Sequence, residues 1–162
     1  MMNKNYYSTI STVTLERFRV ARYVAISPSP ELLVIPYMTQ WAQRSGLLDY
    51  PAYKAQKIGW DFPFVSKEQK ERFGLRGYVS AYIIPEDFIP ACDGAELAYI
   101  ETDTYVTLTI TDPHSDSFSK IPEAYQILSE AAKTSRWENR LVFEKEYEVN
   151  GIHYMDVFYP VN

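Results

Sequence analysis

The 162-residue sequence contains one cysteine, Cys92, and two histidines, His114 and His153. A single cysteine excludes an internal disulfide and is typical of a protein that works in a reducing cytoplasm. The histidines and the cysteine lack the spacing of metal ligands, and no histidine lies near Cys92 in the sequence to activate its thiol. We therefore expect no metal, no cofactor, no cysteine catalysis and a cytoplasmic location.

Long apolar runs and phosphate-binding glycine loops are missing as well. No stretch approaches the ~18 uninterrupted apolar residues of a membrane span, and the first residues, 1–7, lack the apolar core of a secretory signal. The six glycines form no phosphate-cradling loop. A net charge of −5 argues against contact with a phosphate backbone. We expect neither membrane insertion nor direct binding to nucleic acid.

Aromatic residues are unusually abundant: 14 Tyr, 8 Phe and 3 Trp make up 15% of the chain. A tyrosine ring is apolar in its body and polar at its tip, a combination that suits the wall of a ligand pocket. Tyrosine also favours ordinary β-sheet surfaces. Composition alone leaves both interpretations open.

The hydrophobic pattern predicts the order strand, helix, strand, strand twice, with loops rather than linkers between. The expected elements are a long or bent strand 12–27, a helix 35–45, a strand 77–85, a strand or bent strand 97–111, a helix capped by Ser119, and strands 141–149 and 152–161. Pro36 and Pro122 are each expected in the first turn of their helix, where a missing N–H is harmless. The polar loop that carries residues 67–72 could hold a helical turn.

The two halves of the chain are similar in sequence. Tyr23-Val24-Ala25-Ile26 matches Tyr105-Val106-Thr107-Leu108, Ile35-Pro36 matches Ile121-Pro122, and Ile84-Pro85 matches Tyr159-Pro160. These matches predict an internal duplication. We expect one α+β domain over residues 1–162, with pseudo-repeats at about 12–88 and 96–162. A duplicated strand-helix-strand-strand unit would form an antiparallel sheet with two helices on one face and a ligand groove between the halves.

The Asn150-Gly151 dipeptide predicts a tight hairpin, and this turn sets the register of the last two strands. Counting outward from it, Glu144 faces Val157 and shares a side of the sheet with Val142 and Tyr159, with no cation in register. A carboxylate on an apolar face is costly unless something pairs with it. Glu144 is therefore either exposed to water or at the base of an aromatic pocket that awaits a cation or a hydrogen-bond donor.

The candidate binding residues follow from this pattern and from the repeat. They are Glu144, Glu146, Met155 and Tyr159 in the second half, and Trp60, Tyr78 and Tyr82 in the first. A cation gains roughly 0.5–2 kcal/mol from each well-placed ring. A few rings, a carboxylate and apolar burial could together supply the ~8 kcal/mol of micromolar binding.

Several motifs match a known family in order and spacing. They are Arg22-Tyr23-Val24-Ala25, Ile35-Pro36 with Trp41, Ile58-Gly59-Trp60-Asp61, the stretch from Gly77 to Phe88, Ile121-Pro122-Glu123-Ala124-Tyr125, Phe143-Glu144 and Met155-Asp156-Val157-Phe158-Tyr159-Pro160. With these motifs the chain resembles the GyrI-like small-molecule-binding domains. These are bacterial effector-binding domains of AraC-type and MerR-type regulators that respond to many drugs.

The resemblance implies a duplicated fold with a ligand groove and binding of lipophilic, often cationic or aromatic molecules. It places the family's central glutamate at Glu144 and a pocket aromatic at Tyr159. Glu146 stands where many relatives carry an apolar or aromatic residue, so either glutamate could be the central one. Such regulators carry a helix-turn-helix ahead of this domain, and here the match begins about a dozen residues from Met1. A transcriptional role would then act through a partner DNA-binding protein or a homodimer.

Three functions are consistent with the sequence, and it favours a binding module over an enzyme. The first is an effector-sensing or sequestering protein for small hydrophobic molecules. The second, which the resemblance implies, is a hydrolase of strained cyclopropane-bearing toxins, in which Glu144 would activate water and Tyr159 or Tyr82 would donate to the oxyanion. The third, which the resemblance also implies, is a gyrase-inhibitor-like module that binds a protein.

Overall fold

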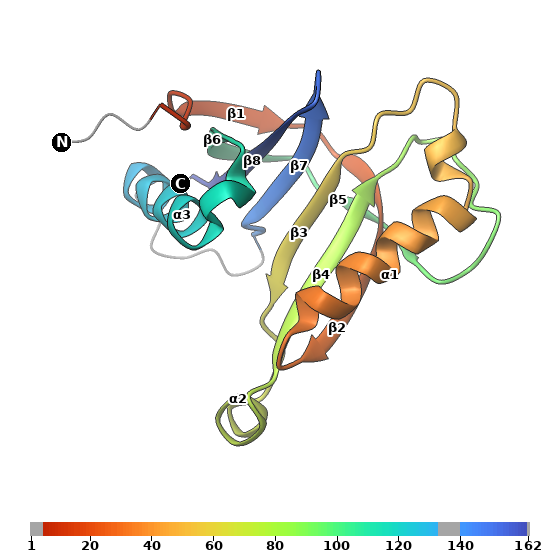
Figure 1. Ribbon diagram of the computed structural model, residues 1–162, viewed down its shortest axis with the longest axis horizontal. Coiled ribbons are helices and arrows are strands. Elements are labelled where there is room, and N and C mark those ends of the chain that lie inside the picture. The colour runs from red at the N-terminus through yellow and green to blue at the C-terminus, as the bar shows by residue number, and fades with distance from the viewer. Residues whose placement is uncertain (1–4, 133–139, 162) are drawn as a thin grey trace. The chain divides into compact units, whose positions relative to one another are not determined.

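The computed structural model describes residues 5–132 and 140–161 (Figure 1). It divides the chain into two compact units. Unit 1 contains Met1–Arg17 and Glu101–Asn162, and unit 2 contains Phe18–Ile100. The ends of the predicted domain, 1–162, lie outside the described residues, as do positions 133–139. In the described part of the chain, each unit contains four strands and one long helix.

Unit 2 is a sheet covered by one long helix. Its elements are β2 (Phe18–Ser27), α1 (Pro30–Arg44), the 3-10 helix η1 (Leu47–Asp49), β3 (Lys57–Phe62), α2 (Lys67–Phe73), β4 (Arg76–Ile83) and β5 (Glu96–Ile100). The strands lie in the order β3-β4-β2-β5, and every neighbouring pair is antiparallel. Helix α1 packs on β2 and β4. Met38 and Trp41 of α1 are almost fully buried against Ala21 and Tyr82.

Unit 1 repeats this design with strands from both ends of the chain. Its elements are β1 (Ser11–Leu15), β6 (Asp103–Thr111), the 3-10 helix η2 (Pro113–Asp116), α3 (Ser117–Ala132), β7 (Phe143–Val149) and β8 (Ile152–Pro160). The strand order is β1-β6-β8-β7, again antiparallel throughout. Helix α3 packs on β6 and β8, and Ala124 and Leu128 are fully buried there.

The α+β class and the internal duplication are therefore confirmed. In unit 2 the strand before the helix, β2, lies between β4 and β5, and in unit 1 the strand before the helix, β6, lies between β8 and β1. The strand after the helix, β3 or β7, stands at one end of the four-strand order of its unit. Each unit is a strand-helix-strand-strand motif with one added strand.

Both helices begin earlier than the sequence pattern predicted. Helix α1 starts at Pro30 and α3 at Ser117, so Pro36 and Pro122 lie inside the helices and not in the first turn. Ser119 is likewise inside α3 and does not cap it. Pro30 occupies the first turn because its φ suits that position. An interior proline removes one helix hydrogen bond, and in both helices burial of an apolar face offsets this cost.

The predicted strands 12–27 and 97–111 are each divided in two. The first becomes β1 and β2, and the second becomes β5 and β6. In both cases the division coincides with the boundary between the units, near Arg17 and Glu101. Continuous β-rich sequence hides such a break, because residue types alone do not show where pairing partners change.

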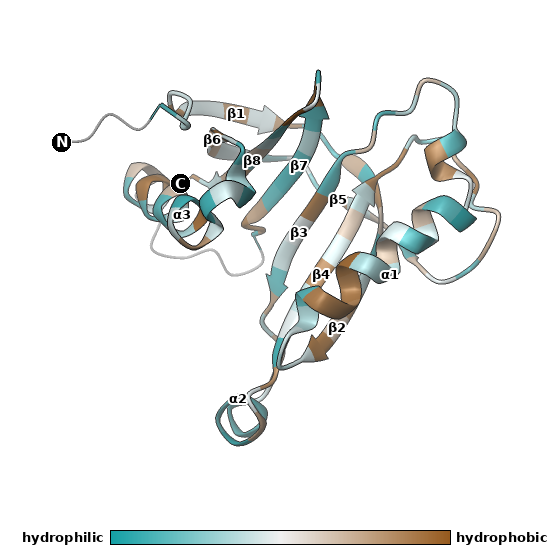
Figure 2. Cartoon of the chain, in the orientation of Figure 1, coloured by the Kyte–Doolittle hydropathy of each residue, from teal (hydrophilic) through white to brown (hydrophobic). Residues whose placement is uncertain are grey.

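Two local predictions hold. The hairpin has the predicted register, from Val149 opposite Ile152 to Phe143 opposite Phe158. The polar loop contains α2, in which Ser66 and Gln69 form a reciprocal capping box. Figure 2 shows α2 as mostly hydrophilic, whereas α1 carries a strongly hydrophobic stretch near its start. Within the described residues, no helix has the length and apolarity needed to cross a membrane.

Candidate functional site

Glu144 lies on the side of the unit 1 sheet that faces α3. It is half-buried on β7, directly opposite Val157, and the neighbouring side chains on β8 are deeply buried. Tyr125 of α3 donates its hydroxyl to Oε2 of Glu144 at 2.8 Å. The carboxylate therefore sits on an apolar surface and is held there by a hydrogen bond from the helix above it.

Tyr125 is a site residue that the pattern of α3 did not reveal. Its helical spacing predicts a core residue, and it does pack partly buried against the unit 1 core. Its hydroxyl, however, reaches the strand and contacts the one carboxylate on β7 that the sequence had singled out. Amphipathic periodicity shows which side of a helix is buried, but it does not show which polar tip meets which partner.

The next carboxylates along β7 have different partners. Glu146 lies opposite Met155 and pairs with His114 of η2. Glu148, nearer the turn, is exposed and pairs with His153 at 3.1 Å. Lys145, on the other side of the strand, pairs with Asp156 at 3.8 Å. Figure 2 shows the resulting hydrophilic character of β7.

Met155 and Tyr159 form the apolar floor beside these carboxylates. Met155 is 1% exposed and Tyr159 is 7% exposed, and both pack with Val157 and with α3 in the unit 1 core. Burial raises the pKa of the Tyr159 hydroxyl above its usual value. Tyr159 is therefore a neutral hydrogen-bonding group at any ordinary pH.

The candidate residues of unit 2 lie on two different faces of its sheet. Tyr82 is 4% exposed and packs under α1. Tyr78 lies on the same face as Tyr82, and its ring covers Gly59 so closely that a Cβ there would be 2.0 Å from the tyrosine hydroxyl. Trp60 lies opposite Val79, on the other face. Strand alternation therefore separates Trp60 from the two tyrosines.

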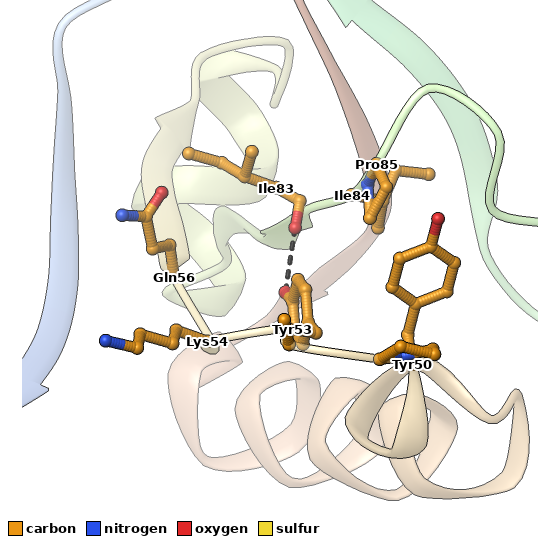
Figure 3. A pocket seen from close by; sticks show the side chains of 9 residues that line it. Tyr50, Tyr53, Lys54, Gln56, Ile83, Ile84 and Pro85 are labelled. Atoms are coloured by element: carbon orange, nitrogen blue, oxygen red, sulfur yellow. Dashed lines mark hydrogen bonds between the residues drawn. The ribbon is translucent and has the colours of Figure 1, made fainter.

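Unit 2 also contains a hollow that includes none of the predicted residues. Its volume is about 340 Å³. It is lined by Tyr50, Pro51, Ala52, Tyr53, Lys54, Gln56, Ile83, Ile84 and Pro85 (Figure 3). The sequence Tyr50-Pro51-Ala52-Tyr53 favours a turn and carries two aromatic residues, and this pattern could have indicated the hollow. Within residues 5–132 and 140–161, no three His, Cys, Asp or Glu side chains are grouped to hold a metal.

Comparison with known proteins finds neither a matching family model nor a matching curated protein. Solved structures do match. The C-terminal domain of EcmrR has a TM-score of 0.61 at 14% identity, over 95% of this chain and 97% of that one. In the complex of EcmrR with DNA, the match covers 58% of the EcmrR chain. SAV2435 bound to tetraphenylphosphonium has a TM-score of 0.60 at 8% identity, over 96% and 94%.

A third match is a protein from Listeria innocua described as a hydrolase, with a TM-score of 0.53 at 10% identity over 91% and 90% of the two chains. These likenesses establish that the chain shares its fold with the C-terminal domain of EcmrR and with SAV2435. They are consistent with the GyrI-like fold that the sequence resembles.

Proposed function

We propose that this chain binds small hydrophobic cations or aromatic molecules through Glu144, as an effector-sensing or sequestering module. The observation that carries the proposal is the half-buried Glu144 carboxylate on the helix-facing side of β7, oriented by Tyr125 at 2.8 Å. A negative charge among apolar side chains attracts a lipophilic cation, which also buries its own apolar surface there.

Glu144 rather than Glu146 is the central carboxylate of this proposal. Glu146 lies nearer the hairpin turn, opposite Met155, and its side chain is 26% exposed. Glu144 lies further from the hairpin turn, opposite a fully buried valine. Met155 and Tyr159 would form the floor of the unit 1 site. The unit 2 residues Tyr78, Tyr82 and Trp60 stay predictions, and the proposal for Glu144 does not rest on them.

The neighbouring structures support this choice of ligand class. SAV2435 shares the fold and was solved with tetraphenylphosphonium, a lipophilic cation. EcmrR carries the same fold at its C-terminus and was solved with DNA. We propose that the present chain likewise reports to transcription in the bacterial cytoplasm, through a DNA-binding partner protein or as a homodimer.

Tetraphenylphosphonium titrated into the protein by calorimetry tests the proposal. We expect saturable binding with a Kd on the order of micromolar. Glu144→Gln keeps the size of the side chain and removes its charge, so it should weaken binding at least about tenfold. Glu148→Gln is the matched control on the same strand and should leave affinity unchanged. Equal affinity of the wild type and Glu144→Gln would overturn the proposal.

Hydrolysis is a second candidate, favoured by the fold shared with the Listeria innocua hydrolase and by a carboxylate beside a tyrosine hydroxyl. In that function Glu144 would orient or deprotonate water, and Tyr159 or Tyr125 would donate to the developing oxyanion. The wild type and Glu144→Gln also decide between binding and hydrolysis. Ring opening of an activated cyclopropane by the wild type, lost in Glu144→Gln, would assign turnover in place of binding.

A further inference from the structure

We propose that the hollow in unit 2 is a second binding site and that it takes small planar aromatic carboxylates. The site is independent of Glu144, and its ligand has the opposite charge. The hollow, of about 340 Å³, falls within the size range of small-molecule pockets. Figure 3 shows Tyr50 and Pro85 at one end of it and Lys54 and Gln56 at the other.

The frame of the hollow is tied together by hydrogen bonds. Tyr53 donates its hydroxyl to the carbonyl oxygen of Ile83 at 2.7 Å (Figure 3). The backbone N–H of Ile83 in turn donates to the carbonyl of Gln56 at 3.0 Å. Burial raises the pKa of the Tyr53 hydroxyl, so this donor stays protonated. The segment that carries the hollow's polar end is thereby fixed to the end of β4.

The turn that forms one wall is conformationally strained. The N–H of Tyr53 donates to the carbonyl of Tyr50 at 3.0 Å, which closes a β-turn around Pro51 and Ala52. Ala52 has a φ of 61°, a left-handed conformation that a residue with a Cβ rarely adopts. Strain of this kind gathers at binding sites, where surrounding structure holds it in place. Here the turn places Tyr50 and Tyr53 on the same side of the chain.

Tyr50 is held as a flat wall. Its hydroxyl donates to Oδ1 of Asp87 at 2.5 Å, and its ring packs edge-on against Phe88 with a centroid distance of 5.9 Å. A ring fixed at both its tip and its side offers a planar apolar surface, to which Pro85 adds a second. A planar aromatic ligand matches these surfaces.

Charge selects the ligand's polar group. Lys54 is the one charged residue among the nine that line the hollow, and it is exposed at the end opposite Tyr50. The Gln56 side-chain amide lies beside it and adds donors. A ligand whose ring lies against Tyr50 would direct its other end toward Lys54, and a carboxylate is the group that this ammonium and amide favour.

The test is a titration of the whole chain with sodium 2-naphthoate, followed through backbone amide chemical shifts. We expect saturable shifts concentrated at residues 50–56 and 83–85, with a Kd of about 1 mM for so small a ligand. Neutral 2-naphthamide should bind about fivefold more weakly, because an exposed ion pair adds only modestly to affinity.

Two variants complete the experiment. Lys54→Glu should weaken naphthoate binding about tenfold, since attraction becomes repulsion. Lys70→Glu changes the same charge at an exposed position on α2 and should leave binding unchanged. The shifts themselves report whether each variant is folded. Naphthamide binding as tightly as naphthoate, equal effects of the two substitutions, or shifts scattered over the chain would overturn the proposal. Glu144→Gln should not alter naphthoate binding, so the proposal for this site and the proposal for the cation site can be overturned independently.

Discussion

The two units share a fold but differ in charge at the matching position of the strand that follows the helix. If Ile84-Pro85 is aligned with Tyr159-Pro160, Tyr82 matches Val157. The residue opposite Val157 is Glu144, and the residue opposite Tyr82 is Lys57. One unit therefore carries a carboxylate where the other carries an ammonium group.

The helices differ at matching positions too. If Pro36 is aligned with Pro122, Thr39 takes the place of Tyr125. The Thr39 hydroxyl donates to the carbonyl of Ile35 in its own helix at 3.0 Å, whereas Tyr125 reaches across to Glu144. The duplicated architecture supplies two equivalent places, and the side chains put a carboxylate in one and an ammonium group in the other. A fold positions a site, but the residues decide what it binds.

Both units have a buried core beneath their long helix, so damage to either core should lower the free energy of unfolding by the same amount. Met38 of α1 and Leu128 of α3 are both fully buried. Met38→Ala and Leu128→Ala should each lower the free energy of unfolding by about 3 kcal/mol, the usual cost of such a cavity. Urea titration followed by circular dichroism measures this. Leu33→Ala, at an exposed position of α1, should cost under about 0.5 kcal/mol. A loss below about 1 kcal/mol for one core variant alone would show that the two cores are not equivalent.

The sequence predicted the repeated parts of the fold well, because each rests on local chemistry. The Asn150-Gly151 turn determines its hairpin within a few residues, and the register follows by counting. The starts of the helices were predicted too late, because Pro36 and Pro122 look like first-turn prolines. Their true positions depend on tertiary packing that outweighs a lost hydrogen bond.

The candidate site was predictable in part. Glu144 stands out because strand alternation and hairpin register are local rules, and they place it among apolar neighbours. Tyr125 could not be paired with it from sequence, since the contact joins residues 19 apart through the packing of a helix on a sheet. The hollow at Tyr50 depends on a left-handed Ala52, and residue preferences argue against that conformation at an alanine.

The two helices differ at one matching position, so a substitution should weaken binding at Tyr125 and should not at Thr39. Tyr125→Phe removes the hydroxyl that orients Glu144 and should weaken tetraphenylphosphonium binding about fivefold, which corresponds to about 1 kcal/mol, the usual net contribution of one hydrogen bond. Thr39→Val removes the matching hydroxyl in unit 2 and should leave binding unchanged. Calorimetry measures both. An equal loss in both variants would mean that Tyr125 acts through general stability and not through Glu144.

The two units also differ in how exposed their ion pairs are. In unit 1, Arg140 makes two hydrogen bonds to Asp103, at 2.8 and 3.0 Å, and the two side chains are 29% and 25% exposed. In unit 2, Arg22 pairs with Glu96, whose side chain is 65% exposed. Asp103→Asn keeps an oxygen that can accept the Thr104 N–H, so the substitution removes only the negative charge. It should lower the free energy of unfolding by about 0.5–1 kcal/mol at pH 7, and Glu96→Gln should lower it by less.

The unit 1 pair should also lose its effect in acid. Hydrogen bonds from Arg140 hold the pKa of the Asp103 carboxyl below its usual value of 3.8. A depressed pKa means that the folded state favours the ionised form. The stabilisation is therefore complete above the unfolded pKa and disappears as pH falls through the lower, folded one. Urea titrations of the wild type and Asp103→Asn should differ at pH 7, and the difference in the free energy of unfolding should shrink as the pH falls below 3.8. A constant difference across that range would mean that Asp103 stabilises unit 1 through its shape and its remaining hydrogen bonds, not through its charge.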